Sequence, residues 1–222
     1  MDVIRIMQKC LHSVKIKKLD ILSLKLDLVK VYEKVNWTFI RLLLLKIGLP
    51  YEVVKWIMSC ISTTCFVVLV NGRPSRFFNS EGGLRHGCSL SPLLFLLVIE
   101  GLRRLITNAK RRGLVQGVKV SISKFISHIL FVDDVLLFGN GNFEEWHEIY
   151  GLIGTFSVSP RMEFSAFKSC ILRNDIEEGT LTQILNLFPY KVVDFDLGFK
   201  YLGFWLKPNR YLTKDWDGLI KR

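Results

Sequence analysis

The sequence predicts an α+β fold with a mainly antiparallel sheet, and three observations support this. Apolar and polar residues alternate with a period of two over residues 21–29, which is typical of a strand. Two further apolar segments fold back on themselves around turn residues near 71–72 and 132–134. Helical patterns lie between these strands without strict strand–helix–strand alternation, which argues against a parallel sheet.

Composition limits the class of protein. The chain has 222 residues, half of them hydrophobic, so it can bury a substantial core and is not expected to be disordered. Lys and Arg number 31 against 20 Asp and Glu, giving a net charge of +11. A basic balance of this size suits a polyanionic partner, first nucleic acid and second an anionic membrane. The plain alternative is a basic protein with no such partner.

Cysteine usage and hydropathy point to an intracellular protein. The five cysteines form no pair or cluster with zinc-ligand spacing, so we expect reduced thiols. The first fifteen residues mix charged and apolar side chains and contain no signal-peptide core. The most hydrophobic segments are interrupted by charged residues or proline well short of the ~20 residues that a membrane span needs. We expect no membrane association, while nucleus and cytoplasm cannot be distinguished.

The first half of the chain contains clear local signals. Along residues 22–28 four leucines alternate with other residues, so we expect them on the core face and Asp27 on the opposite, non-core face beside Lys25. Asn36 is placed to cap a helix that ends at Gly48. A second helix is expected over about 51–62.

The second half continues the mixed pattern. Asn71-Gly72 between apolar runs predicts a hairpin, and Ser91 with Pro92 predicts the N-cap and first residue of a helix over 92–110. Residues 124–138 read as another hairpin with its turn at 132–134. The remaining expected elements are helices near 143–156 and 179–188 and strands near 191–195 and 199–206.

The segment HILFVDDVLLFGN, residues 128–140, places Asp133 and Asp134 in an apolar stretch. Burying an unpaired carboxylate costs several kcal/mol, so we expect the pair at the hairpin tip. If this hairpin lies beside the strand of Asp27, three carboxylates converge and repel one another unless cations bind. Two Mg²⁺ ions ~3.5–4 Å apart can clamp the attacking and leaving oxygens of phosphoryl transfer. The alternative is an exposed Asp-Asp turn without a chemical role.

Five segments occur in the order of the palm motifs of reverse transcriptases. They are LKLDLVKVYEKVNW, GLRHGCSLSPLLFLLVIEGL, ISHILFVDDVLLF, FSVSPRMEFSAFKS and YLGFWL. The flanking segments NGRPSRFFNSEGGLRHGCSLSP and DWDGLIKR are similar to non-LTR (LINE-type) retrotransposons. The chain therefore resembles the reverse transcriptase domain of that class over nearly its whole length.

The resemblance implies roles for individual residues. Asp27, Asp133 and Asp134 match the catalytic, metal-binding aspartates, and the backbone of Leu28 lies near the metal-bound triphosphate. Lys168 matches a lysine that is a candidate acid for the leaving pyrophosphate. Tyr32 and Gly87 are implied to contact the incoming nucleotide. The positions implied to contact template or primer are Gly83, Arg85, His86, Ser91, Pro92, Tyr201, Leu202 and Gly203.

Several residues depart from the family pattern. His86 stands where glutamine is usual, and an imidazole lacks the paired donor and acceptor of an amide. Glu33 replaces the usual aspartate, and Gly82 occupies a position that is commonly arginine. Val31 and Val132 replace alanines, and Pro160 is expected to bend the loop of the fourth motif.

The resemblance implies an RNA-directed DNA polymerase palm over residues 1–206 and the start of a thumb over 207–222. It would use two Mg²⁺ or Mn²⁺ ions, an RNA template, a DNA primer and deoxynucleoside triphosphates; the oligomeric state is not indicated. The fingers motifs are absent upstream of residue 1 and the thumb is short, so weak or no activity of this fragment is expected. The alternatives are a non-catalytic basic nucleic-acid-binding remnant and a relic without a maintained role.

Overall fold

The computed structural model describes residues 2–121 and 124–208. The chain divides into two compact units, which are described separately. The first comprises Met1–Leu28, Arg103–Ile153 and Phe164–Arg222, and the second comprises Val29–Leu102 and Gly154–Glu163. The expected thumb segment, apart from residues 207 and 208, lies outside the described residues.

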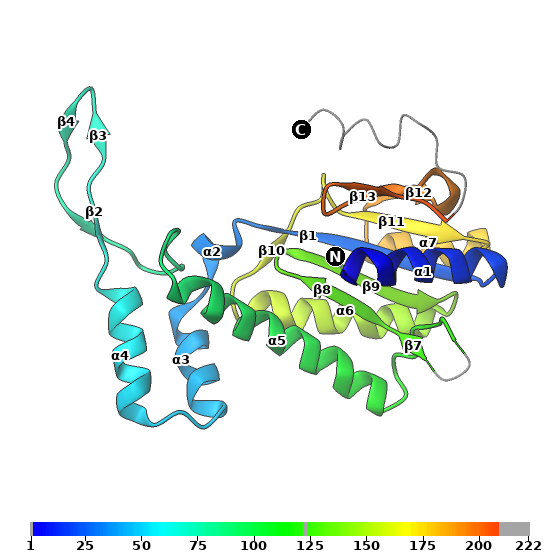
Figure 1. The fold of residues 1–222 in the computed structure, drawn as a ribbon, viewed down its shortest axis with the longest axis horizontal. Helices are drawn as coiled ribbons and strands as arrows, with labels where there is room; N and C mark the ends of the chain where they lie inside the picture. Colours follow the sequence, from blue (N-terminus) through cyan, green and yellow to red (C-terminus); the bar gives the residue numbers. More distant parts are fainter. Residues whose placement is uncertain (1, 122–123, 209–222) are drawn as a thin grey trace. The chain divides into compact units, whose positions relative to one another are not determined.

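The first unit is built on a sheet with strand order β12-β11-β1-β9-β8, and β10 pairs with β1 (Figure 1). The pairs β1–β11, β1–β9 and β8–β9 are antiparallel and β11–β12 is parallel, so the expected mainly antiparallel sheet is confirmed. The strands are β1 (Ile21–Val29), β8 (His128–Phe131), β9 (Asp134–Asn140), β10 (Glu163–Phe164), β11 (Cys170–Asn174) and β12 (Lys191–Asp194).

Helices and short hairpins complete this unit. The helices are α1 (Asp2–Ile16), the C-terminal part of α5 (Leu90–Arg111), the part of α6 (Phe143–Val158) up to Ile153, α7 (Glu178–Leu187) and a 3₁₀ turn, η1 (Phe195–Leu197). The hairpins are β6 (Val118–Lys119) with β7 (Phe125–Ile126), and β13 (Phe199–Tyr201) with β14 (Phe204–Leu206). The hairpin turn expected at 132–134 and the expected helices and strands after residue 140 are confirmed within a few residues.

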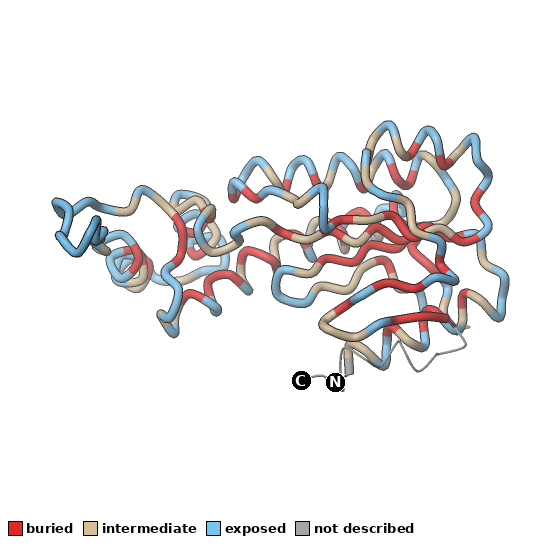
Figure 2. The backbone as a smooth tube through the Cα atoms, turned by 90° about the horizontal axis from the view of Figure 1, so that it is seen from above, coloured by how far each residue is buried: buried red, intermediate tan, exposed pale blue. Residues whose placement is uncertain are grey.

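Both faces of the sheet are buried, which corrects the expectation that Asp27 lies on a non-core face. On its face, α1 and the β13–β14 hairpin cover the sheet, and Ser23 is fully buried. Figure 2 shows buried residues running along the strands of this sheet. The buried residues of this cluster are Met7, Leu11, Val14, Ile21, Val118, Leu136, Phe138, Leu172, Phe195, Phe199, Tyr201 and Leu206. Asp27 is therefore at the end of a second core layer and not on a solvent-facing surface.

Helix α1 was not predicted from the sequence. Charged and apolar residues are closely mixed along this segment, and the sequence was used only to argue that it is not a signal peptide. The structure shows an amphipathic helix that buries Met7, Leu11 and Val14, spaced three to four residues apart on one helical face. Lys15, in the last turn of the helix, pairs with Asp196 at 2.5 Å.

The second unit contains α2 (Val31–Lys34), α3 (Trp37–Lys46), α4 (Tyr51–Ser62) and the N-terminal half of α5. The predicted cap is confirmed, because Asn36 Oδ1 accepts hydrogen bonds from the N–H groups of Thr38 and Phe39 at 2.7 and 3.3 Å. After α4 the chain forms a long hairpin, in which β2 (Cys65–Phe66) pairs with β5 (Phe78–Asn79) and β3 (Leu69–Val70) with β4 (Arg73–Pro74). Asn71 and Gly72 form its turn with φ of 50° and 77°, as predicted.

Helix α5 begins before the predicted position. It starts at Leu90, so Ser91 is inside the first turn and is not the N-cap. Ser91 is 1% exposed, and Pro92 is tolerated because the first turn of a helix needs no N–H donor. Among the described residues, no helix is both long and apolar enough to cross a membrane.

Candidate active site

Asp27 and Asp134 face each other across the sheet. They are Cα partners in the antiparallel register of β1 and β9, so their side chains project from the same face. Directly opposed residues have Cβ atoms about 4.5–5.5 Å apart. The two side chains are 18% and 16% exposed. The predicted approach of Asp27 to the hairpin carboxylates is therefore present in the structure.

A lysine stands beside each of these carboxylates. Lys25 Nζ lies 3.6 Å from Asp134 Oδ1, and Lys168 Nζ lies 3.5 Å from Asp27 Oδ1. Lys25 is 15% exposed and reaches Asp134 along the sheet face, because it precedes Asp27 by two residues on β1. Lys168 is 70% exposed and approaches from the loop after β10. The two ammonium groups reduce the repulsion that the carboxylates would otherwise experience.

Burial sets the protonation chemistry of Asp134. The pKa of this carboxyl is raised, first by burial and further by Asp133 and Asp27, while Lys25 opposes the rise. Protonation of Asp134 is thus easier than that of a solvated aspartate. A cation bound at the site would favour the ionised form.

Asp133 has a different environment from its neighbour. It lies in the turn between β8 and β9 and is exposed, and its C=O accepts a hydrogen bond from Leu28 N–H at 3.3 Å. Val132, the preceding turn residue, has φ of 52°. A β-branched residue rarely adopts this left-handed conformation, so the turn is strained. The two adjacent aspartates therefore have different surroundings in the structure.

The loop carrying Lys168 is held against the backbone of Asp27. Ser165 N–H donates to Asp27 C=O at 2.8 Å, and Asp27 N–H donates to Ser169 Oγ at 3.2 Å. Lys168 N–H donates to Ser165 Oγ at 3.3 Å. These bonds place Lys168 beside the carboxylates even though its side chain is mostly exposed.

The predicted primer-contacting hairpin lies in the same unit. Leu202 and Gly203 form the β13–β14 turn with φ of 49° and 85°. The Tyr201 side chain is fully buried, and its hydroxyl has no hydrogen-bond partner among the described residues. Burial, together with Asp134, raises its pKa. The structure thus places the tyrosine side chain in the core, and the predicted primer contact stays a prediction.

The second unit holds the other predicted contact residues. The Tyr32 ring lies 5.3 Å from the rings of both His86 and Phe95, measured between centroids. A pocket of about 340 Å³ is lined in part by Gly83, Arg85 and His86. His86 Nε2 lies 3.7 Å from Glu33 Oε1, and Arg85 is exposed.

Backbone packing explains one glycine of this unit. Gly83 has φ of 82°, and an added Cβ would meet the carbonyl oxygen of Glu33 at 2.6 Å. Gly83 N–H donates to Val35 C=O at 2.9 Å, and Gly83 C=O accepts from Trp37 Nε1 at 2.6 Å. The loop is therefore fixed by main-chain contacts. Roles of Tyr32, Gly83, Arg85, His86, Gly87, Ser91 and Pro92 with a ligand stay predictions.

The carboxylates suit a hard cation only in part. No three His, Cys, Asp or Glu side chains within 2–121 and 124–208 are arranged to hold a metal ion. Mg²⁺ nevertheless commonly uses one or two carboxylates together with substrate phosphates. The opposed pair of Asp27 and Asp134, with Asp133 next to it, meets that smaller requirement.

Comparison with known proteins decides the family. The model of the family described as reverse transcriptase (RNA-dependent DNA polymerase) matches residues 2–206. The chain belongs to this family.

Relatives of this reverse transcriptase domain support the assignment. An uncharacterized mitochondrial protein of Arabidopsis thaliana, AtMg01250, is 42% identical over 67 residues, which cover 30% of this chain and 55% of that protein. Two structures of telomerase from Candida tropicalis, one in complex with a fragment of telomeric RNA and one apo form, each align with a TM-score of 0.57 at 13% identity. They cover 77% and 80% of this chain and 29% and 36% of theirs, so the chain spans only part of each relative. The structural likeness shows a shared fold, consistent with a palm-like α+β domain.

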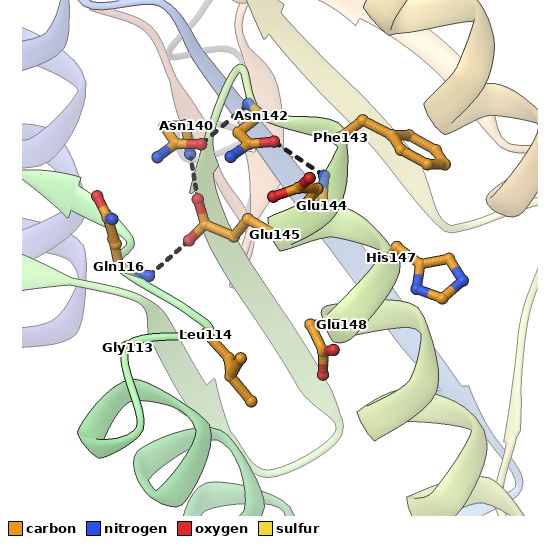
Figure 3. A pocket seen from close by; sticks show the side chains of 10 residues that line it. All are labelled: Gly113, Leu114, Gln116, Asn140, Asn142, Phe143, Glu144, Glu145, His147 and Glu148. Atoms are coloured by element: carbon orange, nitrogen blue, oxygen red, sulfur yellow. Dashed lines mark hydrogen bonds between the residues drawn. The ribbon is translucent and has the colours of Figure 1, made fainter.

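A polar pocket of the reverse transcriptase domain was not predicted from the sequence. It has a volume of about 600 Å³ and lies where β9 ends and α6 begins (Figure 3). Glu145, 4% exposed, accepts hydrogen bonds from the N–H groups of Gln116 and Gly117 through Oε1 at 2.8 and 2.9 Å, and from Asn140 N–H through Oε2 at 3.1 Å. Gln116 and Gly117 are distant from Glu145 in sequence, so no local pattern could identify these two bonds, whereas Asn140 is only five residues away. Glu145 connects three segments and has a structural role.

Proposed function

We propose that this domain is an RNA-directed DNA polymerase of the non-LTR (LINE) type, which transfers a nucleotide to a primer 3′-hydroxyl on an RNA template. The observation that carries the proposal is the opposition of Asp27 and Asp134 in the register of β1 and β9, with Asp133 exposed at the adjoining turn. The family match over residues 2–206 supports RNA-directed polymerisation. The LINE assignment is supported by the segments around the motifs, such as NGRPSRFFNSEGG.

The site residues have defined parts in this proposal. Asp27, Asp133 and Asp134 would hold Mg²⁺ together with substrate phosphates, and two such ions would lower the pKa of the primer hydroxyl and neutralise charge on the phosphates. Lys25 lies beside Asp134 and balances part of the negative charge of the three carboxylates. Lys168 is the proton donor for the leaving pyrophosphate, since its exposed ammonium group lies 3.5 Å from Asp27.

The remaining assignments follow the same family pattern. We assign residues 1–206 to the palm and 207–222 to the start of a thumb, and the extent of the family match supports the first boundary. Template RNA, primer and deoxynucleoside triphosphates are the proposed partners. We assign the primer contact to the hairpin segment of Tyr201, Leu202 and Gly203.

Primer extension on an RNA template tests the proposal. The domain is assayed with Mg²⁺ or Mn²⁺ beside Asp133→Asn, a near-isosteric change at an exposed position. Asp175→Asn is the matched control, because Asp175 is also exposed and has a left-handed φ of 51°. Extension that is lost only in Asp133→Asn supports the polymerase. Equal extension by Asp133→Asn and wild type would contradict the metal assignment.

A second candidate is a non-catalytic nucleic-acid-binding domain. One observation favours it, since Lys25 and Lys168 already compensate Asp134 and Asp27 without any metal. Titration calorimetry with Mn²⁺ separates the candidates independently of turnover. Heat of binding that Asp133→Asn removes favours the polymerase, and retained template–primer binding without metal binding or extension favours the second candidate.

A further inference from the structure

One stretch of the first unit concentrates positive charge. Residues 101–124 contain no Asp or Glu and seven Lys and Arg, and none of these seven has a part in the proposed chemistry. We call them the basic surface: Arg103, Arg104, Lys110, Arg111, Arg112, Lys119 and Lys124. Six of the seven are exposed, and Lys110 is half-buried.

Helical geometry arranges four of these cations, Arg103, Arg104, Lys110 and Arg111, on the outer side of α5. Leu102, Ile106 and Ala109 are buried and define the side of the helix that faces the core. Arg103 and Lys110, and likewise Arg104 and Arg111, are seven residues apart, which brings each pair nearly into line along the helix axis. The two pairs form adjacent rows about 100° apart on the helix and away from the buried side.

The β6–β7 hairpin extends this surface. Lys110 Nζ donates to Phe125 C=O at 2.9 Å, which ties the end of α5 to β7. On the hairpin, Lys119 Nζ lies 5.8 Å from the centre of the Phe125 ring, and Lys124 is exposed. The helix and the hairpin therefore present their cations together.

Two of these cations lower the pKa of a histidine in the adjoining sheet. The pKa of His128 is lowered by burial first and then by Arg103 and Lys110. Both cations thus act on the same point from the helix that covers β8.

The hairpin part of the basic surface lies at the end of the sheet opposite the carboxylates. Gly117 and Asn140 N–H groups share the Glu145 carboxylate, so the base of the hairpin adjoins the C-terminal end of β9. Asp134 is at the other end of that strand, six residues away. At about 3.3 Å per residue the base of the hairpin is roughly 20 Å from Asp134, so the cations on the hairpin, Lys119 and Lys124, lie too far away to contact phosphates at the reacting centre.

We propose that the basic surface is a second nucleic-acid-binding site, which holds the phosphates of an RNA strand away from the reacting centre. Arg and Lys on an exposed helix face bind phosphate oxygens without reading sequence. The choice of RNA over an anionic membrane rests on the proposed function, which brings an RNA strand to within about 20 Å. Glu144 and Glu148 line a pocket next to Gly113 and Leu114, and their negative charges mark the limit of the basic surface on that side.

The test measures binding of a fluorescein-labelled RNA strand by anisotropy, in EDTA so that metal-dependent catalysis has no part. Arg111→Gln/Lys124→Gln is compared with wild type over about 50 to 200 mM salt. Arg41→Gln/Lys46→Gln is the matched control, because it removes one Arg and one Lys at exposed positions of α3. Each lost contact with a single strand lowers the salt slope by about 0.7, so the double variant should lose about 1.4. Its affinity near 0.1 M salt should fall at least roughly tenfold.

The outcomes separate this site from the polymerase proposal. A loss confined to Arg111→Gln/Lys124→Gln, with affinity kept in the charge-preserving Arg111→Lys/Lys124→Arg variant, supports the site whether or not the domain extends a primer. Equal losses in the α3 control overturn it, because the binding would then follow net charge alone. Unchanged RNA affinity with lost binding to phosphatidylserine vesicles also overturns it and assigns the surface to a membrane. A charge-preserving variant that folds but binds weakly contradicts the phosphate contacts as well.

Discussion

The buried carboxylate of Glu145 offers the sharpest test of how the first unit is held together. Its two oxygens accept three main-chain N–H bonds from Gln116, Gly117 and Asn140. Figure 3 shows the bonds from Gln116 and Asn140. Replacement by alanine removes all three acceptors at once. The Gly117 N–H is buried, whereas the other two bonds are only part-buried and water can replace their acceptor.

The expected cost follows from these environments. A buried donor left without a partner costs about 1–3 kcal/mol, and each part-buried bond contributes about 0.5–1.5 kcal/mol. We therefore expect Glu145→Ala to lower the free energy of unfolding by about 3 kcal/mol. Glu145→Gln keeps one acceptor oxygen but turns an NH₂ group toward a main-chain donor, so it should cost about 1 kcal/mol.

Urea denaturation followed by circular dichroism measures the difference. Glu144→Ala is the matched control, because Glu144 is exposed and lies in the same first turn of α6. Both alanine variants lose the interaction of a carboxylate with the helix N-terminus, about 0.3–1 kcal/mol, so only the excess in Glu145→Ala reports the three bonds. The reasoning fails if the two alanine variants are equally stable.

Three further changes test other parts of the structure. Lys25→Gln should lower the free energy of unfolding by about 1–2 kcal/mol at neutral pH, because Asp134 loses the cation beside it; chemical denaturation with Lys25→Arg as control measures this. The pKa of His128 is lowered from 6.5 in the folded state, so its contribution to stability is present above pH 6.5 and lost as the pH falls below it; denaturation at several pH values should show a steeper loss in wild type than in His128→Gln. Gly117→Ala should destabilise by more than about 2 kcal/mol, because its φ is 75° and an added Cβ would lie 2.5 Å from a carbonyl oxygen of β7. Gly113→Ala has a similar φ of 77° and open space, so its thermal melting should shift much less.

Local signals in the sequence predicted local structure well. The alternation along β1, the Asn36 cap and the Asn71-Gly72 turn depend on neighbouring residues, and each is confirmed. Helix α5 shows the limit of such signals. Ser91 followed by Pro92 is a strong cap pattern, yet the helix starts at Leu90 and buries the serine.

Features that depend on distant segments were missed or misassigned. The face of β1 that carries Asp27 read as non-core because Ser23 and Lys25 are polar, but α1 and the β13–β14 hairpin cover it. No residue of β1 indicates that covering, which comes from both ends of the chain. Likewise, Glu145 is an ordinary first-turn glutamate in the sequence, and only the fold brings the N–H groups of Gln116 and Gly117 to it.

The same distinction explains the two adjacent aspartates. The sequence predicted that burying them would need positive charge nearby, and the structure supplies part of it through Lys25 beside Asp134. Asp133 is exposed and follows Val132, whose left-handed φ of 52° costs about 1–2 kcal/mol. Val132 is 40% exposed, so little apolar burial offsets that strain. A strained turn with small packing benefit is more common at functional sites than in purely structural turns. Asp134 thus contributes to the fold as an ion-paired carboxylate. The packing of the fold does not offset the strain of the turn that exposes Asp133, and a cation bound by Asp133 would explain why the turn is kept.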